Sequence, residues 1–150
     1  MTVALGYLIY VSQAEEGLDD DGLAEILTHS RSYNAAHDIT GALLFVQGRD
    51  NRRGSFMQLL EGEPDEIERL RARIFADPRH HTKVVLEQGP LDSRKFADWS
   101  MSFRNVKPEA LAAHPEFADM AEPAFLDRCL RSEVSKALPF LCEFWYSDPI

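Results

Sequence analysis

The chain has 150 residues, about the length of one ordinary domain, and its formal net charge at pH 7 is -9. A surface this acidic repels phosphate backbones and anionic lipid, so neither nucleic acid nor a membrane is an expected partner. The N-terminus lacks a basic region followed by an apolar stretch, and no segment reaches the ~18 apolar residues of a membrane span, so we expect a soluble, cytoplasmic protein.

The first predicted element is a strand from Ala4 to Ser12. Apolar residues occupy both of its alternating faces, as expected for a strand inside a sheet rather than at its edge. An acidic turn follows, in which Asp19, Asp20 or Asp21 can cap a helix by accepting hydrogen bonds from its free amide groups. A helix from about Asp21 to Ser32 is therefore predicted.

The apolar stripe of this helix includes one hydroxyl group. The spacing places Ser30 on the same face as Ile26. Asn34 follows the helix, at a point where asparagine commonly adopts a left-handed conformation. A purely structural role is therefore one interpretation of Asn34, and a contact to a bound molecule is the other.

Two apolar strands joined by a polar turn are predicted next. The first runs from about Gly41 to Gln47, and the turn GRDNRRGS leads into the second. A glycine-containing polar connection of this kind is typical of an antiparallel hairpin. The turn carries Arg49, Arg52 and Arg53, which we interpret as part of a solvated loop rather than as an anion site.

The second of these strands, within GSFMQLLEG from Gly54 to Gly62, holds one amide among apolar residues. Gln58 either faces water from a half-buried strand or is buried, where an unpaired amide costs ~1–3 kcal/mol. Tyr10 lies in one strand-like run, and Trp99 and Met101 lie in another. If these runs share a sheet, a phenol, an amide, an indole and a thioether can meet over one face.

A second helix is predicted after this strand. Pro64 suits its first position, and Ile67, Leu70 and Ile74 form its apolar stripe. It is expected to end before Pro78, because the residue that precedes a proline resists the helical conformation.

Strands over Lys83–Gln88 and Trp99–Phe103 complete the predicted core. The order is strand, helix, strand, strand, helix, strand, strand, which is the split βαβ arrangement of ferredoxin-like folds with one strand added. We predict an α+β fold in which a mixed five-stranded sheet carries two helices on one face. This domain is assigned to residues 1–106.

A change of composition marks residues 107–150, which we assign to a C-terminal helical extension on the other face of the sheet. A helical stripe from about Pro123 is formed by Leu126, Cys129, Leu130, Val134 and Leu138, and an aromatic end follows with Phe140, Leu141, Phe144, Trp145 and Tyr146. Either the extension simply covers the open face or it exposes an apolar patch for another subunit, and both can hold in part. Cys129 and Cys142 lack the spacing of a metal site, so we expect buried free thiols and no metal.

Several separate motifs fall in one order across the predicted core. They are LIYVSQ with Tyr10, SYNAAHDITG with Asn34, FMQLLEG with Gln58, the DPRHH run from Asp77 to His81, and DWSM with Trp99 and Met101. With these motifs the chain resembles the BLUF family, blue-light sensors using flavin, over about Leu5 to Val106. The resemblance implies a ferredoxin-like sheet and a flavin held between the two helices, with FAD expected first and FMN or riboflavin as alternatives.

The resemblance also implies roles for single residues. Tyr10 is the expected photochemical donor of an electron and a proton, Gln58 is the amide that switches its hydrogen bonds, and Asn34 anchors the flavin's pyrimidine edge. A carboxamide suits that edge because it donates and accepts at once. Trp99 and Met101 are implied to lie on the strand that responds to light, and whether Trp99 points toward the flavin is left open.

Further flavin contacts are expected from Ile26, Ser30, Arg73, Asp77, Arg79 and His80. Arg73 and Asp77, at i and i+4 on the second helix, have a plainer alternative as a surface ion pair worth ~0.3–0.5 kcal/mol. His80 and His81 can likewise be a solvated loop pair. The sequence departs from the family pattern in the long turn of residues 48–55 and in Tyr33, which stands where the family often has a polar or basic residue.

The predicted function is a blue-light photoreceptor in which rearranged hydrogen bonds among Tyr10, Gln58 and a flavin signal to a downstream protein effector or through a homo-oligomer. The alternative is a ferredoxin-like small-molecule binding module without photochemistry. We expect no enzyme, because the spacings of catalytic Ser/His/Asp, Cys/His and metal sites are lacking and no output domain follows the core.

Overall fold

The computed structural model describes residues 4–15, 17–48, 53–77 and 80–146, and the side chains of residues 80–82 lie outside that description. The strands are β1 (Gly6–Ala14), β2 (Thr40–Val46), β3 (Ser55–Gly62), β4 (His80–Pro90) and β5 (Ser102–Val106). The helices are α1 (Asp20–Ala36), α2 (Pro64–Phe75), α3 (Pro123–Leu130), α4 (Ala137–Tyr146) and a short 3-10 turn, η1 (Pro108–Leu111).

The five strands form one sheet in the order β4-β1-β3-β2-β5. β1 pairs antiparallel with β3 and β4, β2 pairs antiparallel with β3, and β5 runs parallel to β2. β1 and β2 are therefore parallel, with β3 between them, which is the split arrangement of ferredoxin-like folds with β5 added at one edge. The predicted fold class, the hairpin and the internal position of the first strand are confirmed.

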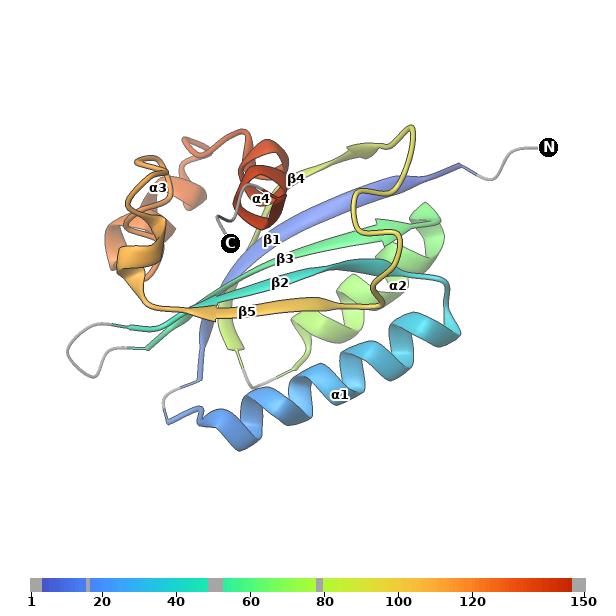
Figure 1. The fold of residues 1–150 in the computed structure, drawn as a ribbon, viewed down its shortest axis with the longest axis horizontal. Coiled ribbons are helices and arrows are strands. Elements are labelled where there is room, and N and C mark those ends of the chain that lie inside the picture. The colour runs from blue at the N-terminus through green and yellow to red at the C-terminus, as the bar shows by residue number, and fades with distance from the viewer. Residues whose placement is uncertain (1–3, 16, 49–52, 78–79, 147–150) are drawn as a thin grey trace.

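The sheet is covered on both faces. Figure 1 shows α1 and α2 on one face and α3 and α4 on the other. The alternation along β3 explains this, since Phe56 and Leu60 pack with the helices α1 and α2 while Met57 and Leu59 pack with the C-terminal extension. The predicted placement of helices and extension on opposite faces is correct.

Helix α1 begins directly after its capping residue and ends later than the sequence predicts. The Asp19 carboxylate accepts a hydrogen bond from the Gly22 amide at 2.9 Å, so Asp19 is the cap among the three candidates. The helix continues to Ala36, which places Asn34 inside it. The left-handed residue after the helix is Asp38, with φ of 53°. The interpretation of Asn34 as a left-handed end residue is therefore wrong.

The last strand begins at Ser102, later than the sequence predicts. Trp99 and Met101 lie just before it, so the expectation that they belong to the strand is wrong. Side chains of α1 explain the late start, since Arg31 and Asn34 donate hydrogen bonds to backbone carbonyl groups of residues 101 and 100. Strand pairing with β2 starts only beyond these carbonyl groups.

The extension contains two helices where the sequence suggested one continuous stripe. The chain takes positive φ values at Ser132 (59°) and Lys136 (62°), which end α3 and precede α4. As a result Leu130 is 60% exposed, although Leu126, Cys129 and Val134 are buried as predicted. Both cysteines are free thiols, and burial raises the pKa of Cys129 to about 11.

Helix α4 closes the second face of the sheet. Phe140, Leu141 and Trp145 are buried in the same cluster as Ile9 and Met57 of the sheet. The interpretation of the extension as a cover is thus confirmed, while the aromatic end also leaves Tyr146 57% exposed. Within the described ranges, every helix is too short or too polar to cross a bilayer.

Candidate cofactor pocket

An open pocket of about 450 Å³ lies between α1, α2 and the sheet. This volume is within the usual range for small-molecule sites. Among the flavin contacts expected from the sequence, those that line it are Tyr10, Ile26, Ser30, Gln58, Arg73 and Asp77. His29, Ser32 and Tyr33 of α1 also line it, although the sequence did not single them out as contacts. His29 and Ser32 lie one residue before and two residues after Ser30, so the helical stripe that contains Ser30 does not identify them.

Tyr10 and Gln58 meet at the base of the pocket. They are directly opposite each other in the β1–β3 pairing, so their side chains share the face that carries the helices. The Tyr10 hydroxyl donates a hydrogen bond to Gln58 Oε1. Their exposed fractions are only 2% and 4%, so the interpretation of Gln58 as a water-facing residue is wrong.

Gln58 also reaches the segment that precedes β5. Its Nε2 donates to Met101 Sδ at 3.6 Å, and Met101 is buried. A thioether sulfur only accepts hydrogen bonds, so this contact requires the NH₂ end of the amide to face Met101. The amide thus links a phenol to a thioether, and its orientation is set from both sides.

The Tyr10 phenol is held neutral. Burial raises the pKa of Tyr10 well above its ordinary value, and the nearby Asp77 carboxylate raises this pKa further. The Phe75 ring packs edge-on against it, with centroids 5.5 Å apart. Tyr10 therefore keeps its proton across the physiological pH range and presents it to Gln58.

Asn34 is fully buried beside the pocket but outside its lining. Its Nδ2 donates to the Ser100 carbonyl at 2.7 Å. Its Oδ1 is buried without a hydrogen-bond partner among the described residues. Such an atom costs ~1–3 kcal/mol until it accepts a hydrogen bond, so Asn34 is prepared to bind an N–H donor.

Two residues of the pocket lining, Tyr33 and Arg73, belong to a stack that the sequence did not predict. The rings of Tyr33 and His37 lie 4.1 Å apart and nearly parallel, and the Arg73 guanidinium sits over Tyr33 at 4.5 Å. His37 Nδ1 contacts Glu66 Oε2 at 2.8 Å, which ties α1 to α2. Asp77 lies beyond the end of α2, so the expectation that Arg73 and Asp77 both lie on this helix is wrong, while their pairing stays a prediction.

Trp99 faces away from the pocket. Its ring lies 5.9 Å from Phe96 and 6.3 Å from Tyr146 of α4, and it is 41% exposed. The backbone bends at Ser100, between Trp99 and the inward-facing Met101. This settles the direction that the sequence left open.

Three expectations fall partly or wholly outside the described residues. Arg79 and the arginines at positions 49 and 52 lie in ranges that the structure does not describe. His80 begins β4, opposite Ala14, with only its backbone described. Their expected roles therefore stay predictions.

Comparisons with known proteins agree with one another. A family model described as "Sensors of blue-light using FAD" matches residues 5–102. The photoactivated adenylate cyclase subunit beta of Euglena longa is 33% identical over 114 residues, which cover 75% of this chain and 12% of that protein. The blue light- and temperature-regulated antirepressor BluF of Escherichia coli K12 is 30% identical over 101 residues, or 67% of this chain and 23% of that one.

Solved structures show the same likeness over most of the chain. The ground state of BlsA is 29% identical with a TM-score of 0.71, covering 97% of this chain and 91% of that chain. The dark state of BlrB, described as a BLUF protein, is 28% identical with a TM-score of 0.66, covering 88% and 96% respectively. This chain spans only about an eighth of the cyclase subunits but nearly the whole of these two structures.

Proposed function

Because this chain belongs to the BLUF family of blue-light sensors that use FAD, we propose that it is a photoreceptor holding a flavin in the pocket between α1, α2 and the sheet. The observation that carries the proposal is the buried hydrogen bond from Tyr10 to Gln58 at the pocket base. A binding module without photochemistry needs no such pairing of a neutral phenol with a switchable amide.

The residues present suit a flavin. Its pyrimidine edge alternates carbonyl acceptors with an N–H donor, and the unpartnered Oδ1 of Asn34 can accept that N–H. Ile26, Ser30 and Arg73 line the pocket and are proposed as further contacts, as is Asp77. Contacts from residues 79 and 80 remain predictions from the family resemblance.

Tyr10 is the proposed donor. When bound, the flavin supplies the absorption of blue light and an electron-accepting excited state. Tyr10 is buried and neutral, so the loss of an electron leaves its hydroxyl proton strongly acidic, and the existing hydrogen bond leads that proton to Gln58 Oε1. No movement of the backbone is required for this transfer.

Gln58 is the proposed switch. Once the electron and the proton have returned to Tyr10, a rotated amide presents its donor and acceptor ends exchanged, with no net transfer of protons. The end that then faces Met101 is the carbonyl oxygen, an acceptor, and the thioether sulfur has no proton to give. The Nε2 to Sδ contact at 3.6 Å is lost in the same event, which releases Met101.

The signal is proposed to leave through the segment before β5. Met101 contacts Gln58 on the pocket side, while Trp99 contacts α4 on the other side. We infer a downstream protein effector or a second copy of the chain as receiver, and the exposed ring of Tyr146 supports a contact there. The relatives named as cyclases are much longer, since this chain covers 12% of one and 39% of another, so a sensory and not a catalytic role is proposed.

The division into a flavin-binding part, residues 1–106, and an extension, residues 107–150, belongs to the same proposal. So do the cytoplasmic location and the homo-oligomer predicted from the sequence. The deciding experiment is an absorption spectrum of the purified protein before and after blue light. We expect a flavin spectrum whose band moves slightly to the red under blue light and recovers in darkness. A flavin band that does not change under blue light would instead support the binding module without photochemistry.

A further inference from the structure

A fully buried carboxylate lies on the same strand as Gln58 but on the opposite face. Glu61 Oε1 accepts hydrogen bonds from the Phe96 amide and the Thr40 hydroxyl, both at 3.0 Å. Its Oε2 accepts from the Lys95 amide at 2.6 Å. A buried charge is tolerated only when its oxygens are satisfied, and here backbone groups of the β4–β5 connection do most of this.

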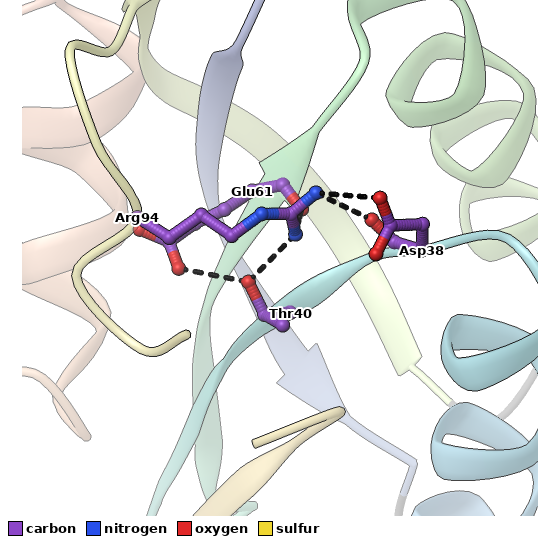
Figure 2. Close-up of polar contacts among 4 residues, drawn as sticks. All are labelled: Asp38, Thr40, Glu61 and Arg94. Atoms are coloured by element: carbon purple, nitrogen blue, oxygen red, sulfur yellow. Dashed lines mark hydrogen bonds and ion pairs between the residues drawn. The ribbon is translucent and has the colours of Figure 1, made fainter. Parts of the chain in front are cut away.

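A guanidinium group completes the arrangement, as Figure 2 shows. Arg94 donates to the Thr40 hydroxyl at 2.9 Å and to the Glu61 carbonyl at 3.1 Å. Its other nitrogen donates to the Asp38 carbonyl at 2.8 Å and pairs with the exposed Asp38 carboxylate at 3.2 Å. We call this set the Glu61 clamp: Glu61, Thr40, Arg94 and Asp38, with the amides of Lys95 and Phe96.

The clamp fixes the start of the segment that carries Met101. Phe96, whose amide Glu61 binds, is itself fully buried against α4, with ring centroids 5.7 Å from Trp145 and 5.5 Å from Tyr146. The Trp99 amide then donates back to the Phe96 carbonyl at 3.1 Å. Residues 96–101 therefore form a short link with the clamp at one end, the pocket at the other and α4 along its side.

We propose that Glu61 is a positioning residue for signalling, which holds the Phe96 end of this link so that release of Met101 is passed on to α4. The inference rests on the proposed photoreceptor function. With one end fixed, displacement at Met101 must change the contacts of Trp99 and Phe96 with α4. If both ends of the link are free, residues 96–101 move together, and α4 keeps the contacts that it has in darkness.

The matched variants come from the clamp itself. Glu61→Gln keeps the shape but replaces one acceptor oxygen by an NH₂ group, which cannot accept from a backbone amide. Thr40→Val removes the hydroxyl bond to the same carboxylate and leaves both backbone bonds in place. Both are studied as the full chain loaded with FAD, in darkness and under blue light.

Two measurements separate the outcomes. The red shift of the flavin band reports the proposed function, and amide hydrogen exchange of residues 95–101 and 137–146 reports the link and α4. In Glu61→Gln we expect the wild-type red shift, dark exchange of the Lys95 and Phe96 amides faster by roughly ten-fold, and loss of most of the light-dependent change in α4. Thr40→Val should keep the α4 change.

A wild-type α4 response in Glu61→Gln overturns the inference, as does the lack of any light response in wild-type α4. If Thr40→Val loses as much of the light-dependent change in α4 as Glu61→Gln does, the role of Glu61 cannot be assigned to its two bonds with backbone amides. A missing red shift in the wild-type protein instead overturns the proposed function. If Glu61→Gln does not retain FAD, Glu61→Asp replaces it, because the shorter side chain draws the carboxylate away from the Lys95 and Phe96 amides, and an unchanged α4 response there overturns the inference.

Discussion

The side chains of Met101 and Trp99 lie on opposite sides of the sheet, although only Ser100 separates them along the chain. Met101 packs with Gln58 on the α1–α2 side, and Trp99 packs with Tyr146 on the α4 side. The photochemical site and the extension are therefore joined by backbone, without a long chain of side chains.

Tyr10→Phe should keep the yellow colour and abolish the light-induced red shift. The ring and its packing remain, but the hydroxyl that donates to Gln58 is removed. Absorption spectra in darkness and under blue light measure this. A normal photocycle in the variant would exclude Tyr10 as the donor.

Gln58→Leu should also retain flavin and lose the red shift. Leucine fills similar space, yet it has no donor or acceptor ends to exchange. The same spectra apply, with FAD content measured after denaturation to show that the pocket is loaded. Persistence of the shift in loaded protein contradicts the switch assigned to Gln58.

Met101→Leu should preserve the red shift and slow its recovery in darkness by about two- to five-fold, because the dark orientation of Gln58 loses its N–H···S bond. Volume-conserving changes of this kind usually cost less than about 1.5 kcal/mol. Met57→Leu is the control, since Met57 is buried on the opposite face of the same strand as Gln58. Equal recovery rates in both variants would remove Met101 from the switch.

Asn34→Ala should weaken FAD binding by about ten-fold while changing the stability of the flavin-free protein little. Without flavin, the lost bond to the Ser100 carbonyl is offset by removal of the unpartnered Oδ1. Thermal unfolding with and without FAD measures both effects. Asn105→Ala, at an exposed asparagine bonded to Gln47, is the control. A similar loss of affinity there would mean that Asn34 is not the anchor.

Tyr146→Ser should leave the photocycle unchanged and lower the mass of the oligomer, or remove its dependence on light. The exposed rings of Tyr146 and Trp99 form the apolar surface through which we propose contact with a second copy. Light-scattering mass in darkness and under illumination decides this, with the exposed Leu130→Ser as control. Masses identical to wild type in both states would place the subunit contact elsewhere.

Local patterns in the sequence predicted most of the fold. Period-two alternation identified the strands, and Pro64 and the aspartates near residue 19 marked the helix starts. The prediction of the last strand failed because side chains far away in the sequence form hydrogen bonds with its backbone carbonyl groups. The strand at Ser102 starts late because Arg31 and Asn34, far away in sequence, occupy the preceding carbonyl groups.

The site was predicted unevenly for the same reason. Tyr10 and Gln58 stand in motifs that the family resemblance identifies, and both meet in the pocket. Tyr33 and His37 are four residues apart at the end of α1, but the contact of Arg73 with Tyr33 depends on how α1 and α2 approach each other, which no local pattern predicts. The sequence analysis did not single out Glu61, because only the folded chain brings the amides of Lys95 and Phe96 to its carboxylate.

The burial of Phe140, Leu141 and Trp145 against the sheet has a consequence for protein engineering. A fusion protein that joins a new effector directly after residue 106 would strip this cover and leave an apolar sheet face open to aggregation. An effector is better joined after Tyr146, where α4 ends, because the cover of the sheet then stays in place. An effector attached there would also begin beside the Trp99 ring, so the rotation of its first helix relative to α4 becomes the variable to tune.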